Sequence, residues 1–230
     1  MWNEDRYEWV RMPTWWVQGH AGNGLLHEFG VRDKGISIAS LMIYIMFCAR
    51  ANQMPTEEFT VGTARVTYDD ISNATGLSRS MISKGISKLA DLELIIVVSY
   101  RKQNVYKIVS HGNKPWAKLP KKHLYNNVQK GEISVFLNDF HIRSKNELNA
   151  LKLYYLLLAY RDNDSNVTYI SYGLISEYSG IIKREIRKAI SFLINHNFIQ
   201  LDKVLRQGSE VRANRYEIRG LTHLHAGNKR

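Results

Sequence analysis

Two segments of this chain place basic and hydroxyl side chains on one face of an expected helix. In both, apolar residues recur every three or four positions, which gathers the polar residues on the opposite face. Such a face fits a DNA groove, where Ser, Arg and Lys contact base edges or phosphate oxygens. The alternative is an ordinary solvated helix face. The candidate DNA-contacting residues are Arg79, Ser80, Ser83, Lys84, Ser87 and Lys88 in the first segment, and Lys183, Arg184, Arg187, Lys188 and Ser191 in the second.

Other arrangements that could support catalysis or bind a metal are incomplete. His223 and His225 form a His-apolar-His pair, but neither a partner acid nor a downstream tyrosine accompanies them. The stretch 162–166 begins like a calcium loop, yet Val167 occupies the position that requires glycine. A single cysteine, Cys48, allows neither an internal disulfide nor a cysteine-built zinc site. We therefore expect no enzyme activity, no metal and no cofactor.

The two basic segments belong to an internal repeat. Trp9-Val-Arg-Met-Pro13 recurs as Trp116-Ala-Lys-Leu-Pro120. Phe29-Gly-Val-Arg-Asp-Lys34 recurs as Phe140-His-Ile-Arg-Ser-Lys145. Apolar and glycine positions between Ile71 and Ile95 recur 104 residues later, and the end of each copy matches as well. Four matched blocks in the same order predict two copies of one fold.

Each copy predicts an apolar helix, a short strand, two adjacent helices and a β-hairpin. This is the order of a winged-helix domain, which is built on the helix-turn-helix. The hairpin tips add the candidate contacts Arg101 and Lys102 in the first copy, and Arg206 and Arg212 in the second. The expected helices are 36–50, 68–75 and 79–92, then 147–161, 172–179 and 183–195. The expected strands are one around Val66, 95–99 and 105–109, then 167–170, 199–205 and 215–219.

The fold class expected from these elements is α+β, mainly helical, with two tandem winged-helix domains from a duplication. The domains are residues 1–110, which begin with an aromatic arm, and residues 111–230, which are strongly basic. Residues 1–115 carry 13 basic and 11 acidic side chains, against 19 and 10 in residues 116–230. The glycine, asparagine and proline within residues 110–115 predict an exposed linker, so each domain is expected to fold separately.

The composition favours a nucleic-acid partner. Apolar residues make up 44% of the 230 residues, which excludes a disordered chain. The formal net charge of +11 and the pI near 9.7 favour a polyanion, and nucleic acid before anionic lipid. The longest apolar run, residues 41–49, is half of what a bilayer requires. We therefore expect no membrane association and a cytoplasmic location.

Two apolar features indicate packing beyond a single small domain. Four of the five tryptophans lie in the first 16 residues, namely Trp2, Trp9, Trp15 and Trp16. This aromatic arm either packs on its own domain or forms a surface for a homodimer or a partner protein. The helix around residues 41–49 is apolar on all sides, so a second domain or a second chain is expected to cover it.

The segment DISNATGLSRSMISKGISKLADLELI, residues 70–95, resembles the helix-turn-helix of bacteriophage replication-origin proteins. Two winged helices in a chain of this length also resemble the replication initiators of theta-type plasmids. In that family both domains bind origin DNA, and the C-terminal domain is usually the main anchor. The resemblance implies sequence-specific binding of double-stranded DNA by a replication initiator or origin-binding protein of a plasmid, phage or other mobile element. A transcriptional regulator of such an element is the alternative.

Overall fold

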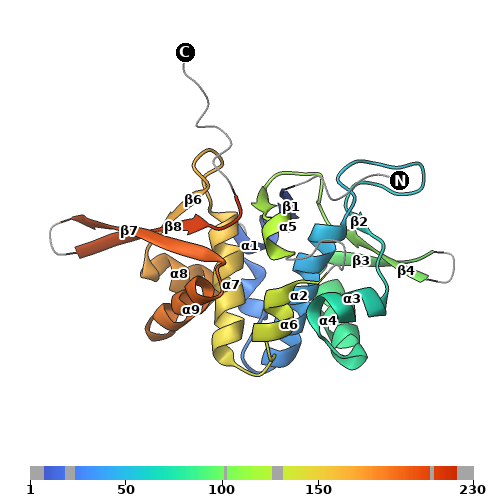
Figure 1. Cartoon of the computed structure of the whole chain (residues 1–230), viewed down its shortest axis with the longest axis horizontal. Helices are drawn as coiled ribbons and strands as arrows, with labels where there is room; N and C mark the ends of the chain where they lie inside the picture. Colours follow the sequence, from blue (N-terminus) through green and yellow to red (C-terminus); the bar gives the residue numbers. More distant parts are fainter. Residues whose placement is uncertain (1–7, 19–23, 101–102, 126–131, 208–209, 222–230) are drawn as a thin grey trace, which may run out of the picture.

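The computed structural model describes residues 8–18, 24–100, 103–125, 132–207 and 210–221. Helices predominate and the strands form three small sheets, which confirms the expected α+β class (Figure 1). Within those ranges, no helix has the length and apolar character needed to cross a membrane.

The first half of the chain follows the predicted order. The helix expected at 36–50 begins two residues earlier, and the short strand ends just before Val66. The elements are β1 (Val10–Pro13), α1 (Trp15–Gln18), the short 3-10 helix η2 (Leu25–Glu28), α2 (Lys34–Arg50), β2 (Thr63–Ala64), α3 (Tyr68–Thr75), α4 (Arg79–Asp91), β3 (Ile95–Tyr100) and β4 (Gln103–Ile108).

The second half repeats this order. The strand 167–170 and the helices 172–179 and 183–195 have the bounds that the sequence predicts, whereas the hairpin strands are longer than expected. The elements are β5 (Trp116–Leu119), α5 (Lys121–Leu124), α6 (Ser134–Asp139), α7 (Lys145–Ala159), β6 (Val167–Ile170), α8 (Tyr172–Ser179), α9 (Lys183–Asn195), β7 (Ile199–Gln207) and β8 (Glu210–Ile218).

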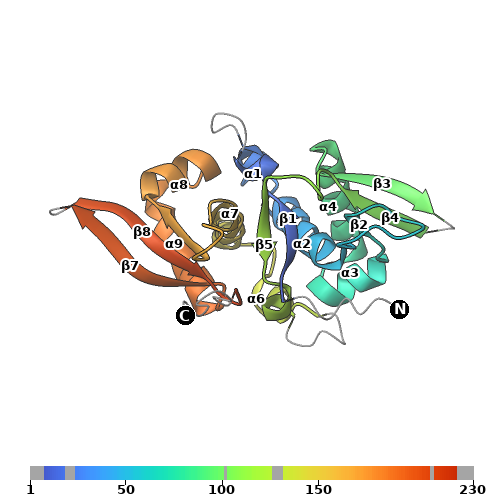
Figure 2. The same cartoon turned by 90° about the horizontal axis from the view of Figure 1, so that it is seen from above.

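Each half builds a three-stranded antiparallel sheet with the same topology. The strand order is β2-β4-β3 in the first half and β6-β8-β7 in the second. In both sheets the last strand of the hairpin lies in the centre and the first strand lies at an edge. Figures 1 and 2 show that the two hairpins point toward opposite ends of the molecule.

The repeated segments that open the two halves pair with each other. β1 and β5 form an antiparallel ribbon in which Val10 lies opposite Leu119, Arg11 opposite Lys118, and Met12 opposite Ala117. Exchanging each residue for its repeat equivalent, 107 positions away, leaves this register unchanged. The two strands of the ribbon are therefore related by a local two-fold axis that passes between Arg11 and Lys118.

A stack of four side chains crosses this ribbon. The rings of Trp9 and Trp116 are parallel within 12°, with their centroids 5.9 Å apart. The Arg11 guanidinium lies 5.3 Å from the centroid of the Trp116 ring, and the Lys118 ammonium lies 5.1 Å from that of Trp9. Stacking and cation-π contacts of this kind stabilise the junction beyond its buried area.

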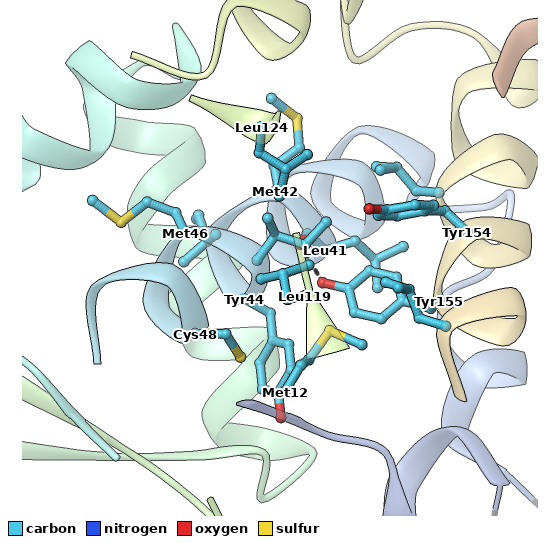
Figure 3. Packing of buried hydrophobic residues seen from close by; sticks show 14 of the residues in the cluster. Met12, Leu41, Met42, Tyr44, Met46, Cys48, Leu119, Leu124, Tyr154 and Tyr155 are labelled. Carbon is cyan, nitrogen blue, oxygen red and sulfur yellow. Dashed lines mark hydrogen bonds between the residues drawn. The ribbon is translucent and has the colours of Figure 1, made fainter. Parts of the chain in front are cut away.

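The second half of the same chain covers the apolar helix of the first. In α2, every residue from Ser37 to Ala49 is buried, against α4 of its own half and against α7 and β5 of the other. The Tyr155 hydroxyl of α7 donates a hydrogen bond to the Leu41 carbonyl at 2.6 Å (Figure 3). Trp16 packs on Phe29 and Tyr44 of the first half and on Tyr155 of the second. The two halves thus share one continuous core.

Each half also contributes a short helix that packs on the other half. η2 of the first half packs on α8 of the second, where His27 Nε2 lies 2.9 Å from the Glu177 carbonyl oxygen. In return α6 packs on α3, and the Ile133 amide just before α6 donates to the Ala74 carbonyl at 3.1 Å. This interlocking and the shared core argue against the separate folding that the linker composition predicts. The boundary at residue 110 stays a prediction.

The aromatic arm lies largely inside this structure. Trp16 is fully buried, Trp9 belongs to the stack on the ribbon, and Trp15 is half-buried against the core. Trp2 lies outside the described residues. Trp9 and Trp16 contact side chains of the second half, and a partner surface on the arm stays a proposal.

One buried histidine in the connection between the halves is expected to make folding acid-sensitive. Burial, and then repulsion by Arg11, lowers the pKa of His111 from 6.5 to about 4. The unfolded chain therefore takes up this proton more readily than the folded chain. The contribution of neutral His111 to the free energy of unfolding is fully present above pH 6.5. We expect about 2–3 kcal/mol of it to be lost as the pH falls from 6.5 to 4.

Urea unfolding at several pH values measures this loss. The variant His111→Phe is expected to lose less stability than the wild type over that window, and the exposed-site control His141→Asn is expected to follow the wild type. Parallel curves for wild type and His111→Phe would contradict the assignment.

Candidate nucleic-acid interface

Local chemistry builds a sharp turn between the two adjacent helices of each half. In the first, Thr67 and Asp70 form a capping box at the start of α3, and the Ser78 hydroxyl accepts the Met81 amide at the start of α4. Gly76 ends α3 with φ 71°, in the left-handed region that favours glycine. These caps and this turn fix the bounds of the two adjacent helices that the sequence predicts here.

The second half repeats this turn with one difference. The Ser171 hydroxyl accepts the Leu174 amide at the start of α8, and Gly180 ends that helix with φ 70°. At the start of α9, Ile182 occupies the position of Ser78 and provides no side-chain cap. The basic residues Lys183 and Arg184 therefore begin a helix whose first amides have no capping side chain.

Helix α4 packs one face on α2 and turns the other to solvent. Ile82, Ile86 and Leu89 are buried, and Gly85 lets the helices approach so closely that an added Cβ would lie 2.7 Å from Ile43 Cδ1. The exposed candidates are Arg79, Ser80, Ser83, Lys84 and Ser87.

Two of the predicted contacts on α4 have partners within the chain. The Arg79 guanidinium donates to the Asp69 carboxylate at 2.6 Å, in an ion pair exposed on both sides. Lys88 is half-buried, with its ammonium 5.5 Å from the centroid of the Phe29 ring. Lys88 therefore fits the proposed contact set less well than Lys84 does. Asp69, which the sequence analysis did not consider, sets where Arg79 points.

Helix α9 exposes a denser row of cations. Ile186, Ala189, Ile190 and Leu193 are buried on the side of α7. The structure places all five candidates of this helix in solvent, which are Lys183, Arg184, Arg187, Lys188 and Ser191.

A polar contact that the sequence analysis missed orients α9. Glu185 accepts hydrogen bonds from Lys145 at 2.8 Å and from Asn149 at 3.1 Å, both on α7. The bond from Lys145 holds the pKa of the Glu185 carboxyl below its ordinary value. The one signal for it in the sequence is a lone acid within the basic run 183–188. Because Glu185 points at α7, its neighbours Arg184, Arg187 and Lys188 are left on the outer side.

The candidates on the hairpins are placed less completely. Arg101 and Lys102 lie outside the described residues. Arg206 lies in β7 opposite Val211, and Arg212 follows in β8. Both arginines therefore belong to strands that are longer than predicted, rather than to the long hairpin tip that the sequence predicts.

The two exposed helices lie on the same side of the molecule. In Figure 1, α4 and α9 are in the lower half, and the β1/β5 ribbon lies above them across the central helices. Each helix packs directly on its long central helix, and the central helices pack on each other. One continuous core therefore connects the two helices that carry the basic faces.

In the part of the chain that the structure covers, no three His, Cys, Asp or Glu side chains gather closely enough to hold a metal. His223 and His225 lie outside that part. The protein-family models, the curated proteins and the solved structures offer no match to this chain.

Proposed function

We propose that this chain binds double-stranded DNA sequence-specifically through two tandem winged-helix domains that arose by duplication. The observation that carries the proposal is a pair of exposed basic helices, α4 and α9, each of which follows a left-handed glycine turn. The repeated order of elements and the shared sheet topology support the winged-helix assignment. The excess of positive charge supports a polyanionic ligand.

The two helices have different side chains and therefore different tasks. On α4, Ser80, Ser83 and Ser87 are short enough to let the helix lie deep in a major groove, where Lys84 and Arg79 reach base edges. On α9, long cations cover the outer face and fit contacts with phosphate oxygens. We assign specificity mainly to α4 and general affinity mainly to α9.

The local two-fold axis determines the expected form of the DNA site. The symmetric register of the β1/β5 ribbon, and the matching packing of α4 on α2 and of α9 on α7, support an approximate two-fold relation between the halves, like that between the recognition helices of a dimer. One chain is therefore expected to cover a composite site whose two halves run in opposite directions and differ in sequence. The half-sites differ because the exposed residues of α4 and α9 differ.

The proposed role is that of a replication initiator or origin-binding protein of a plasmid, phage or other mobile element. It rests on the resemblance of residues 70–95 to phage replication-origin proteins. A transcriptional regulator of such an element is the second candidate. Mapping the bound sites on the source genome distinguishes them, because several composite sites beside an A·T-rich stretch indicate an initiator. A single site that overlaps a promoter indicates a regulator.

Binding is expected to weaken steeply with salt, because the cations displace condensed counterions from the duplex. If six to eight phosphates are neutralised, a plot of log K against log salt concentration has a slope of about −5 to −7. Fluorescence anisotropy on a genomic site and on a random duplex of equal length measures this slope. A slope near zero, or equal affinity for both duplexes, would contradict the proposal.

A further inference from the structure

The first strand of the first hairpin, β3, is an apolar strand at the edge of its sheet. The strand order β2-β4-β3 gives β3 a single neighbour, and no other described strand pairs with it. Ile96, Val97 and Val98 are 51%, 40% and 43% exposed. Adjacent strand residues point to opposite faces, so apolar side chains are exposed on both faces of this edge. An edge of this kind is a template for pairing with another strand.

The equivalent strand of the second half is protected against such pairing. At the positions 104 residues after Ile96 and Val98, β7 has Gln200 and Asp202. The β7/β8 ladder also contains register shifts after Leu201 and after Leu205, whereas the six residue pairs of β3 and β4 run without a shift. Charged residues and bulges are the usual means of blocking an edge. The equivalent edge strands of the two halves therefore differ, because β7 has features that hinder pairing with a further strand and β3 lacks them.

We propose that β3 pairs in antiparallel orientation with β3 of a second copy of this chain, forming a homodimer with one continuous six-stranded sheet. An antiparallel strand pair is self-complementary about a two-fold axis, as an interface between identical chains requires.

The charge of the chain also favours this surface for self-association. Two copies that each carry +11 repel one another over most approaches. β3 itself contains no charged residue over its six positions, Ile95–Tyr100. The interface is one strand wide, smaller than the roughly 800 Å² per partner of a standard complex, so the dimer is expected at micromolar concentrations. This association does not depend on DNA.

Sedimentation equilibrium of the full chain, from about 1 to 100 µM, tests the proposal. The wild type is expected to shift from monomer to dimer over this range. The double variant Ile96→Gln, Val98→Asp gives β3 the residues that β7 has, and we expect it to stay monomeric with unchanged circular dichroism and thermal unfolding. The matched control Leu201→Lys changes a β7 side chain that is also 40% exposed, and is expected to dimerise as the wild type does.

Disulfide cross-linking tests the pairing itself. Hydrogen-bonded and non-hydrogen-bonded pairs alternate along an antiparallel ladder, so a two-fold axis passes between one residue and its own copy. Those two Cα atoms lie within disulfide range. Among Ile96→Cys, Val97→Cys and Val98→Cys, at least one is expected to form a cross-linked dimer under mild oxidation, whereas Leu201→Cys is not.

Three results would overturn the proposal. One is a wild type that stays monomeric at 100 µM, and another is a double variant that dimerises like the wild type. The third is an absence of cross-linking at all three β3 positions. If the double variant sediments as the wild type does but binds DNA more weakly, these apolar residues contact DNA and not a second copy of the chain.

Discussion

Fragments 1–110 and 111–230, produced separately, are expected to remain unfolded, and mixing them is expected to restore the native structure. Each fragment would lose its half of the β1/β5 ribbon and the partner of its exchanged short helix. Trp16 and the α2 face toward α7 would lie in water in the first fragment, and Tyr155 in the second. Neither half retains enough buried surface to offset the entropy of ordering its chain.

A protease site inserted at the exposed residues 112–115 provides the matched control for this experiment. Cleavage there is expected to leave the two pieces associated and cooperatively folded, because the cut breaks no contact of the shared core. After denaturation and separation, circular dichroism and urea titration report on each piece alone. A cooperative unfolding transition of isolated 111–230 would show that the halves are independent domains.

Removing the outer cations of α9 is expected to cause the largest loss of DNA affinity. The variant Arg187→Ala, Lys188→Ala loses two phosphate contacts, so the salt slope is expected to become shallower by about 2 and the affinity to fall by about 10²-fold. Specific and random duplexes are expected to be affected equally, because phosphate contacts carry no sequence information. Both side chains are exposed, so folding is expected to be unchanged.

Variants of α4 are expected to behave differently. Arg79→Ala, Ser83→Ala and Lys84→Ala are each expected to cost about 1–3 kcal/mol on the preferred duplex and little on random DNA, with relaxed preference at particular base pairs. Selection from a randomised duplex pool, followed by titration, measures both effects. Equal losses on specific and random DNA for both helices would contradict the division of tasks.

The local elements of this protein could be predicted from its sequence because their causes are local. Thr67, Ser78 and Ser171 are side chains that satisfy free amides at helix starts, and Gly76 and Gly180 fit a left-handed turn. Apolar residues at helical spacing identified the buried faces of α4 and α9. The repeat identified the second copy of each element. All these signals act within a few residues of their effect.

The arrangement of those elements was decided by contacts between segments that lie far apart in the sequence. The all-apolar character of α2 required a cover, yet only the tertiary structure shows that α7 and the β1/β5 ribbon provide it. The same holds for Trp16 against Tyr155 and for the exchange of η2 and α6. Hydrophobic burial is non-directional, so an apolar sequence states that a face is buried but not which partner buries it.

The candidate site divides in the same way. The exposed cations and serines of α4 and α9 followed from helical spacing alone. The ion pair of Arg79 with Asp69, the contact of Lys88 with Phe29 and the anchoring of Glu185 on α7 did not. Each joins side chains on different elements, and its distance depends on how those elements pack. The sequence by itself determined which residues face outward, and the tertiary structure decided which of them are already engaged.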